Sequence, residues 1–245
     1  MIDFWRITKD VLLPPRCLCC NEYIEKVGLC NNCWREINWI SDPKCEICGQ
    51  PLENESCRYC TANKNYFDRA VSVMIYERLA RQLIINFKDH DATLYAPVFA
   101  QGMNRIIQEF ADEVDFLVSV PISKNCRLTR KYNQTELLCL ELQKLSKLHF
   151  EPRILEKAKE TVAQKTLNRE RRLKNLRKSF TLNPEFPVKS KNILLIDDVI
   201  TTGATSNACA QLLKESGANK VYIATLARVI LKATPSVKPN RKKLD

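Results

Sequence analysis

Four pairs of cysteines dominate the first quarter of this 245-residue chain. Nine of the 12 cysteines fall within the first 60 residues, and eight of them form Cys-x-x-Cys pairs: Cys17/Cys20, Cys30/Cys33, Cys45/Cys48 and Cys57/Cys60. A segment this short and this poor in aliphatic residues cannot hold a fold by burying apolar surface alone. Its structure must therefore depend on chemistry at the sulfur atoms.

The spacing of the pairs favours two zinc sites. Two cysteines separated by two residues can turn both sulfurs to one side of a tight knuckle, and two knuckles supply the four thiolates of a tetrahedral Zn²⁺ site. The simplest arrangement takes the pairs in chain order, although spacing alone leaves an interleaved one open. Because every ligand is a sulfur, no position is free for a reacting water, and we expect both ions to be structural.

Paired cysteines have two other common uses, a disulfide framework and a redox-active motif. Disulfide frameworks are typical of secreted domains. This chain begins without a basic region before an apolar stretch, and only three cysteines follow Cys60. Four regularly spaced pairs are also unlike a single redox motif. We therefore expect a zinc-bound, cytoplasmic protein, and we expect no membrane span because no apolar run approaches ~20 residues.

The remainder of the chain alternates between strand-like and helix-like patterns. Strands are predicted at 70–76, 116–120, 193–196 and 221–226, and helices at 79–87, 95–110, 134–148 and 204–215. This alternation predicts an α/β fold with a mostly parallel sheet flanked by helices and with ligands at the carboxyl ends of the strands. We divide the chain into a small zinc-binding domain (1–66), the α/β domain (67–231) and a basic, flexible tail (232–245).

The motif that carries most chemical information is Ile193-Leu-Leu-Ile-Asp-Asp-Val-Ile-Thr-Thr-Gly-Ala-Thr205. The second half of the motif can bind a phosphate at a helix N-terminus. Thr201, Thr202 and Thr205 supply hydroxyl donors, and the backbone amides around Ala204 supply further donors. Gly203 lets the backbone approach the phosphate closely. Asp197 and Asp198 would repel the phosphate, but they can accept hydrogen bonds from hydroxyls or hold a cation. A strand that merely ends in a capped helix is the structural alternative. A Walker loop is excluded because its Gly-Lys-Ser/Thr element is absent.

This motif resembles the phosphoribosyl pyrophosphate (PRPP) signature of type I phosphoribosyltransferases. The resemblance implies that Asp197 and Asp198 bind the ribose hydroxyls, that the loop 201–205 binds the 5-phosphate, and that Mg²⁺ accompanies PRPP. Together with the zinc pairs, the chain resembles the ComF family of competence-associated proteins, which join a double zinc ribbon to a phosphoribosyltransferase-like domain. Further matches to that family are Lys88, Asn133, Gln134, Gln164, Arg172 and Asn175. Arg78 and Lys131 stand where the family usually has glycine.

Positive charge is concentrated in two places. The chain carries a formal charge of +11, which favours an anionic partner. The loop after the strand at 116–120 holds Lys124, Arg127, Arg130 and Lys131 without an acid between them, which suits pyrophosphate and a nucleic-acid backbone equally. The stretch 147–178 holds 11 basic residues against four acidic ones. A solvated basic surface is the plain alternative for both segments.

Two functions are compatible with these features. The first is a ComF-like protein with a PRPP site that handles single-stranded DNA during natural transformation, with a helicase or translocase of the uptake machinery as a partner implied by the family. The alternative is a catalytically active phosphoribosyltransferase of nucleotide metabolism with no direct DNA role. The sequence shows no obvious element that would recognise an acceptor base, so it leaves turnover open.

Overall fold

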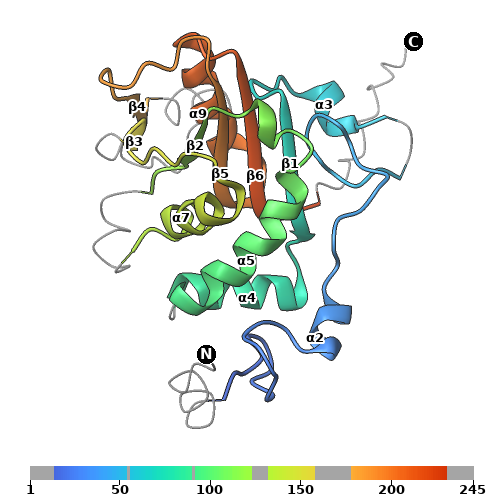
Figure 1. The fold of residues 1–245 in the computed structure, drawn as a ribbon. Helices are drawn as coiled ribbons and strands as arrows, with labels where there is room; N and C mark the ends of the chain where they lie inside the picture. Colours follow the sequence, from blue (N-terminus) through green and yellow to red (C-terminus); the bar gives the residue numbers. More distant parts are fainter. Residues whose placement is uncertain (1–13, 54–55, 90–91, 123–131, 158–177, 231–245) are drawn as a thin grey trace, which may run out of the picture.

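The α/β domain is built on a four-stranded parallel sheet. The computed structural model describes residues 14–53, 56–89, 92–122, 132–157 and 178–230. The strand order is β1-β6-β5-β2, with bounds Arg69–Ile75 (β1), Phe116–Ser119 (β2), Asn192–Ile200 (β5) and Lys220–Arg228 (β6) (Figure 1). All three neighbouring pairs run parallel. The expected α/β class is therefore confirmed, and the carboxyl ends of the four strands share one edge of the sheet.

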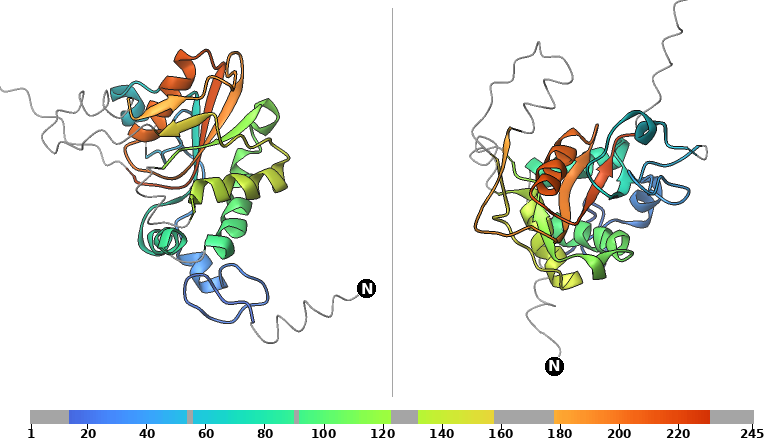
Figure 2. Two further views of the ribbon diagram at one scale, coloured as in Figure 1. Left: turned by 90° about the vertical axis from the view of Figure 1, so that its left-hand side faces the viewer. Right: turned by 90° about the horizontal axis from the view of Figure 1, so that it is seen from above.

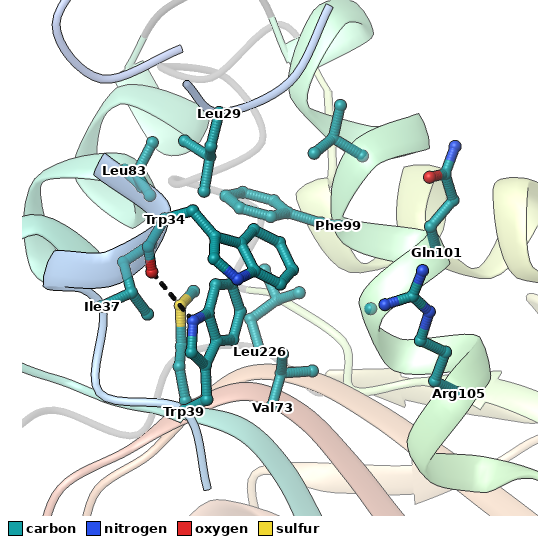
Figure 3. A pocket seen from close by; sticks show the side chains of 13 residues that line it. Leu29, Trp34, Ile37, Trp39, Val73, Leu83, Phe99, Gln101, Arg105 and Leu226 are labelled. Atoms are coloured by element: carbon teal, nitrogen blue, oxygen red, sulfur yellow. Dashed lines mark hydrogen bonds between the residues drawn. The ribbon is translucent and has the colours of Figure 1, made fainter. Parts of the chain in front are cut away.

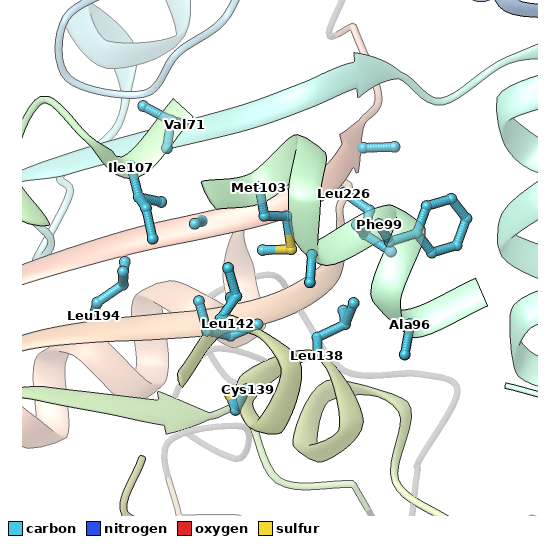
Figure 4. Close-up of a cluster of buried hydrophobic side chains, with 14 of the residues drawn as sticks. Val71, Ala96, Phe99, Met103, Ile107, Leu138, Cys139, Leu142, Leu194 and Leu226 are labelled. Carbon is cyan, nitrogen blue, oxygen red and sulfur yellow. The ribbon is translucent and has the colours of Figure 1, made fainter. Parts of the chain in front are cut away.

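Helices cover both faces of the sheet, which explains why its central strands are apolar throughout. Helices α5 and α7 pack on one face and α9 on the other (Figure 2), and α4 packs against α5. Their bounds are Arg78–Asp89 (α4), Ala92–Ile107 (α5), Gln134–Ser146 (α7) and Ala204–Glu215 (α9). Successive side chains of a strand point to opposite faces. Thus Leu194 joins the core under α5 and α7 (Figure 4), while Ile193 and Leu195 pack with the α9 side.

The structure differs from the sequence expectations at two places. Strand β5 continues to Ile200 instead of stopping at Ile196, because β6 keeps pairing with it as far as Arg228. Both aspartates of the motif therefore lie within the strand. An antiparallel hairpin of two short strands, β3 (Leu155–Lys157) and β4 (Phe180–Leu182), was not expected from the sequence. Its apolar side packs into the α9 core.

The cysteine-rich segment contributes two short helices, α2 (Asn31–Glu36) and α3 (Arg58–Ala62), which lie apart in Figure 1. The chain between them runs along the open edge of β1. There the Ile75 N–H donates to the Asn38 carbonyl at 2.8 Å, and the Ile40 N–H donates to the Val73 carbonyl at 3.0 Å. The cysteine-rich segment is therefore joined to the edge of the sheet by backbone hydrogen bonds.

A small apolar cavity of about 90 Å³ separates α2 from α5 (Figure 3). Trp34 and Trp39 form one wall, with ring centroids 4.1 Å apart, and Trp39 Nε1 donates to the Trp34 carbonyl at 3.0 Å. Among the described residues that line it, Arg105 has the only charged side chain. A cavity of this composition does not suit a phosphorylated sugar. Among the described helices, none combines the length and apolar character needed to cross a bilayer.

Candidate functional site

The eight paired cysteines gather into two clusters in chain order. Within each cluster, Cys17/Cys20/Cys30/Cys33 and Cys45/Cys48/Cys57/Cys60, the Sγ atoms all lie within 4.8 Å of one another. The Sγ–Sγ distances are 3.6 Å for Cys20–Cys30 and Cys48–Cys57 and 3.7 Å for Cys45–Cys60. A tetrahedral zinc ion with bonds of ~2.3 Å places its sulfurs about 3.8 Å apart. Both clusters fit zinc, and the interleaved arrangement is excluded.

The phosphate-type loop joins β5 to α9. Gly203 is the N-cap of α9 and has φ 69°, in the left-handed region that favours glycine. The Asn207 N–H donates to the Gly203 carbonyl at 2.8 Å, which closes the first helical turn. Thr201 and Thr202 are exposed and Thr205 is half-buried, and the first turn holds no acidic residue. The loop therefore presents hydroxyls and helix-terminal amides without a competing negative charge.

The two aspartates point to opposite faces of β5, as neighbours in a strand must. Asp197 points toward α9, where the Ser206 hydroxyl donates to its Oδ2 at 3.1 Å and the Asp198 N–H donates to its Oδ1 at 2.9 Å. Asp198 points toward α4, where its carboxylate pairs with the Lys88 ammonium at 2.6 Å. Burial first, and the charge of Asp198 second, raise the pKa of Asp197 to about 7.

Both aspartates line one pocket at the carboxyl ends of β2 and β5. The pocket has a volume of about 250 Å³. Its other lining residues are Val120, Pro121, Ile122, Gln134, Thr135, Lys157, Val199 and Thr205. Thr201, Thr202, Gly203 and Ala204 are outside this lining, so of the loop only Thr205 reaches it. The pocket thus joins the acidic end of the motif to the start of α9.

The described family-motif residues, Lys88, Asn133 and Gln134, connect the elements around this pocket by hydrogen bonds. Gln134 Nε2 donates to the Lys88 carbonyl at 3.0 Å, which ties α7 to the end of α4. Asn133 caps α7 by accepting from the Thr135 N–H at 3.1 Å, and the Thr135 hydroxyl donates to the Val120 carbonyl at 3.1 Å. These bonds fix the ends of α4, β2 and α7 around the pocket.

Several predicted site residues lie outside the described residues: Lys124, Arg127, Arg130, Lys131, Gln164, Arg172 and Asn175. The structure in turn adds two residues to which the sequence gave no role. Ser206 follows Thr205 directly and bonds Asp197. Lys157 belongs to the basic stretch 147–178 and, of its four described basic residues, is the one that lines the pocket. Neither residue belongs to a sequence motif that would have identified it as a site residue.

Comparison with known proteins identifies both parts of the chain. Residues 8–63 match the double zinc ribbon domain, and residues 152–243 match the phosphoribosyl transferase domain. Competence protein F of Haemophilus influenzae is 30% identical over 225 residues, covering 87% of this chain and 96% of that protein. The chain belongs to the ComF family. The double zinc ribbon expected from the cysteine pairs is thereby confirmed.

The chain has two further similarities to known proteins. The DNA utilization protein YhgH of Salmonella typhimurium is 29% identical over 210 residues, covering 83% of this chain and 91% of that protein. Among solved structures, the phosphoribosylpyrophosphate synthetase from Mycobacterium smegmatis is 21% identical with a TM-score of 0.35. That likeness covers 55% of this chain and 34% of that one.

Proposed function

We propose that this ComF-family protein binds PRPP, or a closely related phosphorylated ribose, together with Mg²⁺ in the pocket between β2, β5 and α9. We further propose that it handles single-stranded DNA in the cytoplasm during natural transformation. The observation that carries the first part is that two carboxylates from β5 share one pocket with Thr205, in the first turn of α9 and next to the loop 201–204. A phosphorylated sugar suits this arrangement, because its hydroxyls can donate to the acids while its phosphate accepts from amides at the helix N-terminus.

In this proposal each group of the pocket has a separate task. The loop 201–205 and the first amides of α9 bind the 5-phosphate, while Asp197 and Asp198 accept hydrogen bonds from the ribose hydroxyls. Mg²⁺ would neutralise the pyrophosphate. A ribose that engages the Asp198 carboxylate frees the Lys88 ammonium from its ion pair, so Lys88 can then compensate ligand charge.

The protonation of Asp197 is compatible with binding of a ribose hydroxyl. Its pKa of about 7 means that near neutral pH the side chain exchanges readily between acceptor and donor forms. A bound cation or hydroxyl donor favours the ionised form, because it attracts or donates a hydrogen bond to the carboxylate and so offsets the repulsion by Asp198. Ligand binding should therefore release a proton from this carboxyl, and affinity for the ligand should rise between pH 6 and pH 8.

The DNA role is supported by the relatives and by charge. The relatives are named competence protein F and DNA utilization protein, and the chain carries a formal charge of +11. The basic loop at 124–131 and the stretch 147–178 would supply contacts to backbone phosphates. A helicase or translocase of the uptake machinery would deliver or receive the strand. Turnover of PRPP onto a base remains the alternative activity of the same pocket.

The ligand proposal is tested by thermal unfolding with and without PRPP and Mg²⁺. A ligand at a hundredfold excess over its Kd stabilises the folded state by about 2.7 kcal/mol. We expect that stabilisation for the wild type and for Asp42→Asn, an exposed control outside the pocket. We expect none for Asp197→Asn combined with Asp198→Asn. An unchanged shift in the double variant would place the ligand elsewhere.

The DNA proposal is tested by the salt dependence of oligonucleotide binding. Each phosphate contact to a single strand contributes ~0.7 to the slope of log K against log salt. Replacing Lys124 and Arg127 by Gln should reduce the slope by about 1.4. A slope that stays the same would show that this loop is solvated surface only. Release of pyrophosphate from PRPP with one of a panel of bases would favour the metabolic alternative.

A further inference from the structure

The second zinc ribbon, which contains the cluster Cys45–Cys60, contacts the phosphate-type loop directly. Tyr59 lies in α3 between the last two cysteines of that cluster. Its hydroxyl donates to the Thr202 carbonyl at 2.7 Å. The same hydroxyl lies 3.3 Å from the place that a Cβ would take at Gly203. The tyrosine therefore bonds to the peptide group that precedes the N-cap of α9.

Other bonds join this ribbon to the elements around the loop. Asn207, in the first turn of α9, accepts from the Tyr66 N–H at 2.7 Å and donates to the Lys64 carbonyl at 3.2 Å. On the other side, the Ala70 N–H of β1 donates to the Ile47 carbonyl of a zinc knuckle at 2.7 Å. The second ribbon is thus bonded to the loop, to α9 and to the sheet at once.

A buried arginine completes this junction. Arg228, the last residue of β6, is 1% exposed, and its guanidinium donates to the Cys48 carbonyl. Its Nε has no hydrogen-bond partner within the described part of the chain. Four thiolates around one Zn²⁺ carry a net charge of −2, so a filled cluster places a compensating anion beside this guanidinium. Without the metal, the buried charge would lose that compensation.

The first zinc ribbon, with the cluster Cys17–Cys33, has different neighbours. The Tyr95 hydroxyl of α5 donates to the Leu18 carbonyl at 3.2 Å, and Leu79 of α4 packs against the cluster. The described residues show no hydrogen bond between this ribbon and the loop 201–205. One chain thus carries two zinc clusters of the same ligand type, of which one is bonded to the loop.

We propose that Tyr59 is a positioning residue for the phosphate-binding loop, and that zinc in the second ribbon is linked through it to phosphate binding. This inference rests on the proposed function of the pocket. Helix α3 has five residues, too few to persist in water alone; one zinc ligand, Cys57, is its N-cap, and another, Cys60, lies within it. Loss of that zinc would release α3, and with it the bond that orients the Thr202 peptide. Loss of zinc from the first ribbon would leave the bond in place.

The test compares Tyr59→Phe with Tyr23→Phe, a control at an exposed tyrosine of the first ribbon. Affinities for PRPP with Mg²⁺ and for inorganic phosphate are measured by calorimetry, together with zinc content. A single lost hydrogen bond corresponds to about a three- to tenfold change in Kd. We expect that loss for Tyr59→Phe with both zinc ions retained, and wild-type affinity for Tyr23→Phe.

A spectroscopic readout separates positioning from a general loss of stability. The amide resonance of Gly203 reports the geometry of the loop, and it should move in Tyr59→Phe but stay in place in Tyr23→Phe. In a second comparison, Cys57→Ser should weaken PRPP binding more than Cys20→Ser. Equal affinity of Tyr59→Phe and wild type, with an unmoved Gly203 resonance, would overturn the inference alone. A wild type that binds neither PRPP nor phosphate would overturn the proposed function as well.

Discussion

Replacing Asp197 by Asn should stabilise the ligand-free protein, although the same change should abolish ligand binding. Asp197 lies beside Asp198 in β5 and points into the α9 side of the sheet. Burial and the neighbouring carboxylate raise its pKa from 3.8 to about 7. The folded protein therefore holds a carboxyl in a place where its charge is unfavourable. Asn has the same shape without the charge, and it can still accept the Asp198 N–H bond.

The size and the pH dependence of the effect follow from the two pKa values. In the unfolded chain the carboxyl loses its proton near pH 3.8, whereas in the folded chain it keeps the proton until about pH 7. Between those values the folded state binds more protons, so the free energy of unfolding falls as the pH rises. A shift of about 3 units corresponds to about 4 kcal/mol at pH 8, and roughly 2–3 kcal/mol of it develops between pH 5 and pH 8.

Urea unfolding of the zinc-loaded protein at pH 5 and pH 8 measures this directly. Asp197→Asn should be more stable than wild type at both pH values, and its advantage should grow with pH. Asp115→Asn is the matched control, because the Asn192 N–H and the Lys191 ammonium lower the pKa of Asp115. That variant should lose stability, and the loss should be largest above pH 4. An Asp197→Asn variant that is destabilised, or whose advantage does not change with pH, would show that the charge of Asp197 is not unfavourable in the folded protein.

Three further outcomes are expected. Arg78 has φ 42°, a left-handed conformation that costs a side chain more than it costs glycine, so Arg78→Gly should raise the free energy of unfolding by about 0.5–1 kcal/mol. At Gly49 a Cβ would lie 2.4 Å from the Ala70 carbonyl oxygen, so Gly49→Ala should lower the free energy of unfolding in urea by about 2–3 kcal/mol. Gly28→Ala is the control: its Cβ would meet no atom closer than 3.8 Å, so this change should lower the free energy of unfolding only slightly. Metal analysis of the purified protein should find two zinc ions per chain, one for each cysteine cluster.

Local patterns were enough to predict most of the fold. The cysteine spacing predicted the two clusters, because a Cys-x-x-Cys knuckle brings its sulfurs together whatever surrounds it. The apolar run 193–196 predicted a strand buried on both faces. The hairpin β3–β4 escaped prediction because each strand has three residues, too few for an alternating pattern to show. The end of β5 escaped it because pairing with β6 overrides the turn preference of the aspartates.

The sequence named both aspartates of the candidate pocket but not the contacts that they make. The Asp-Asp pair and Thr205 of the motif line the pocket, whereas Thr201, Thr202 and Gly203 lie outside it. Arg78, which stands where the family usually has glycine, has a left-handed φ of 42°. The ion pair of Lys88 with Asp198 joins residues 110 positions apart, and the bond of Tyr59 to Thr202 joins residues 143 positions apart. Such pairs depend on the packing of whole elements, which no local pattern records.

A crystal structure of the protein with PRPP and Mg²⁺ would show directly whether the ligand binds in this pocket. The proposed function predicts the 5-phosphate against the amides of residues 202–205, and the ribose hydroxyls within hydrogen-bond distance of Asp197 and Asp198. It also predicts that the Lys88 ammonium has left the Asp198 carboxylate. A ligand bound elsewhere, with this pocket empty and the Lys88–Asp198 pair intact, would contradict it.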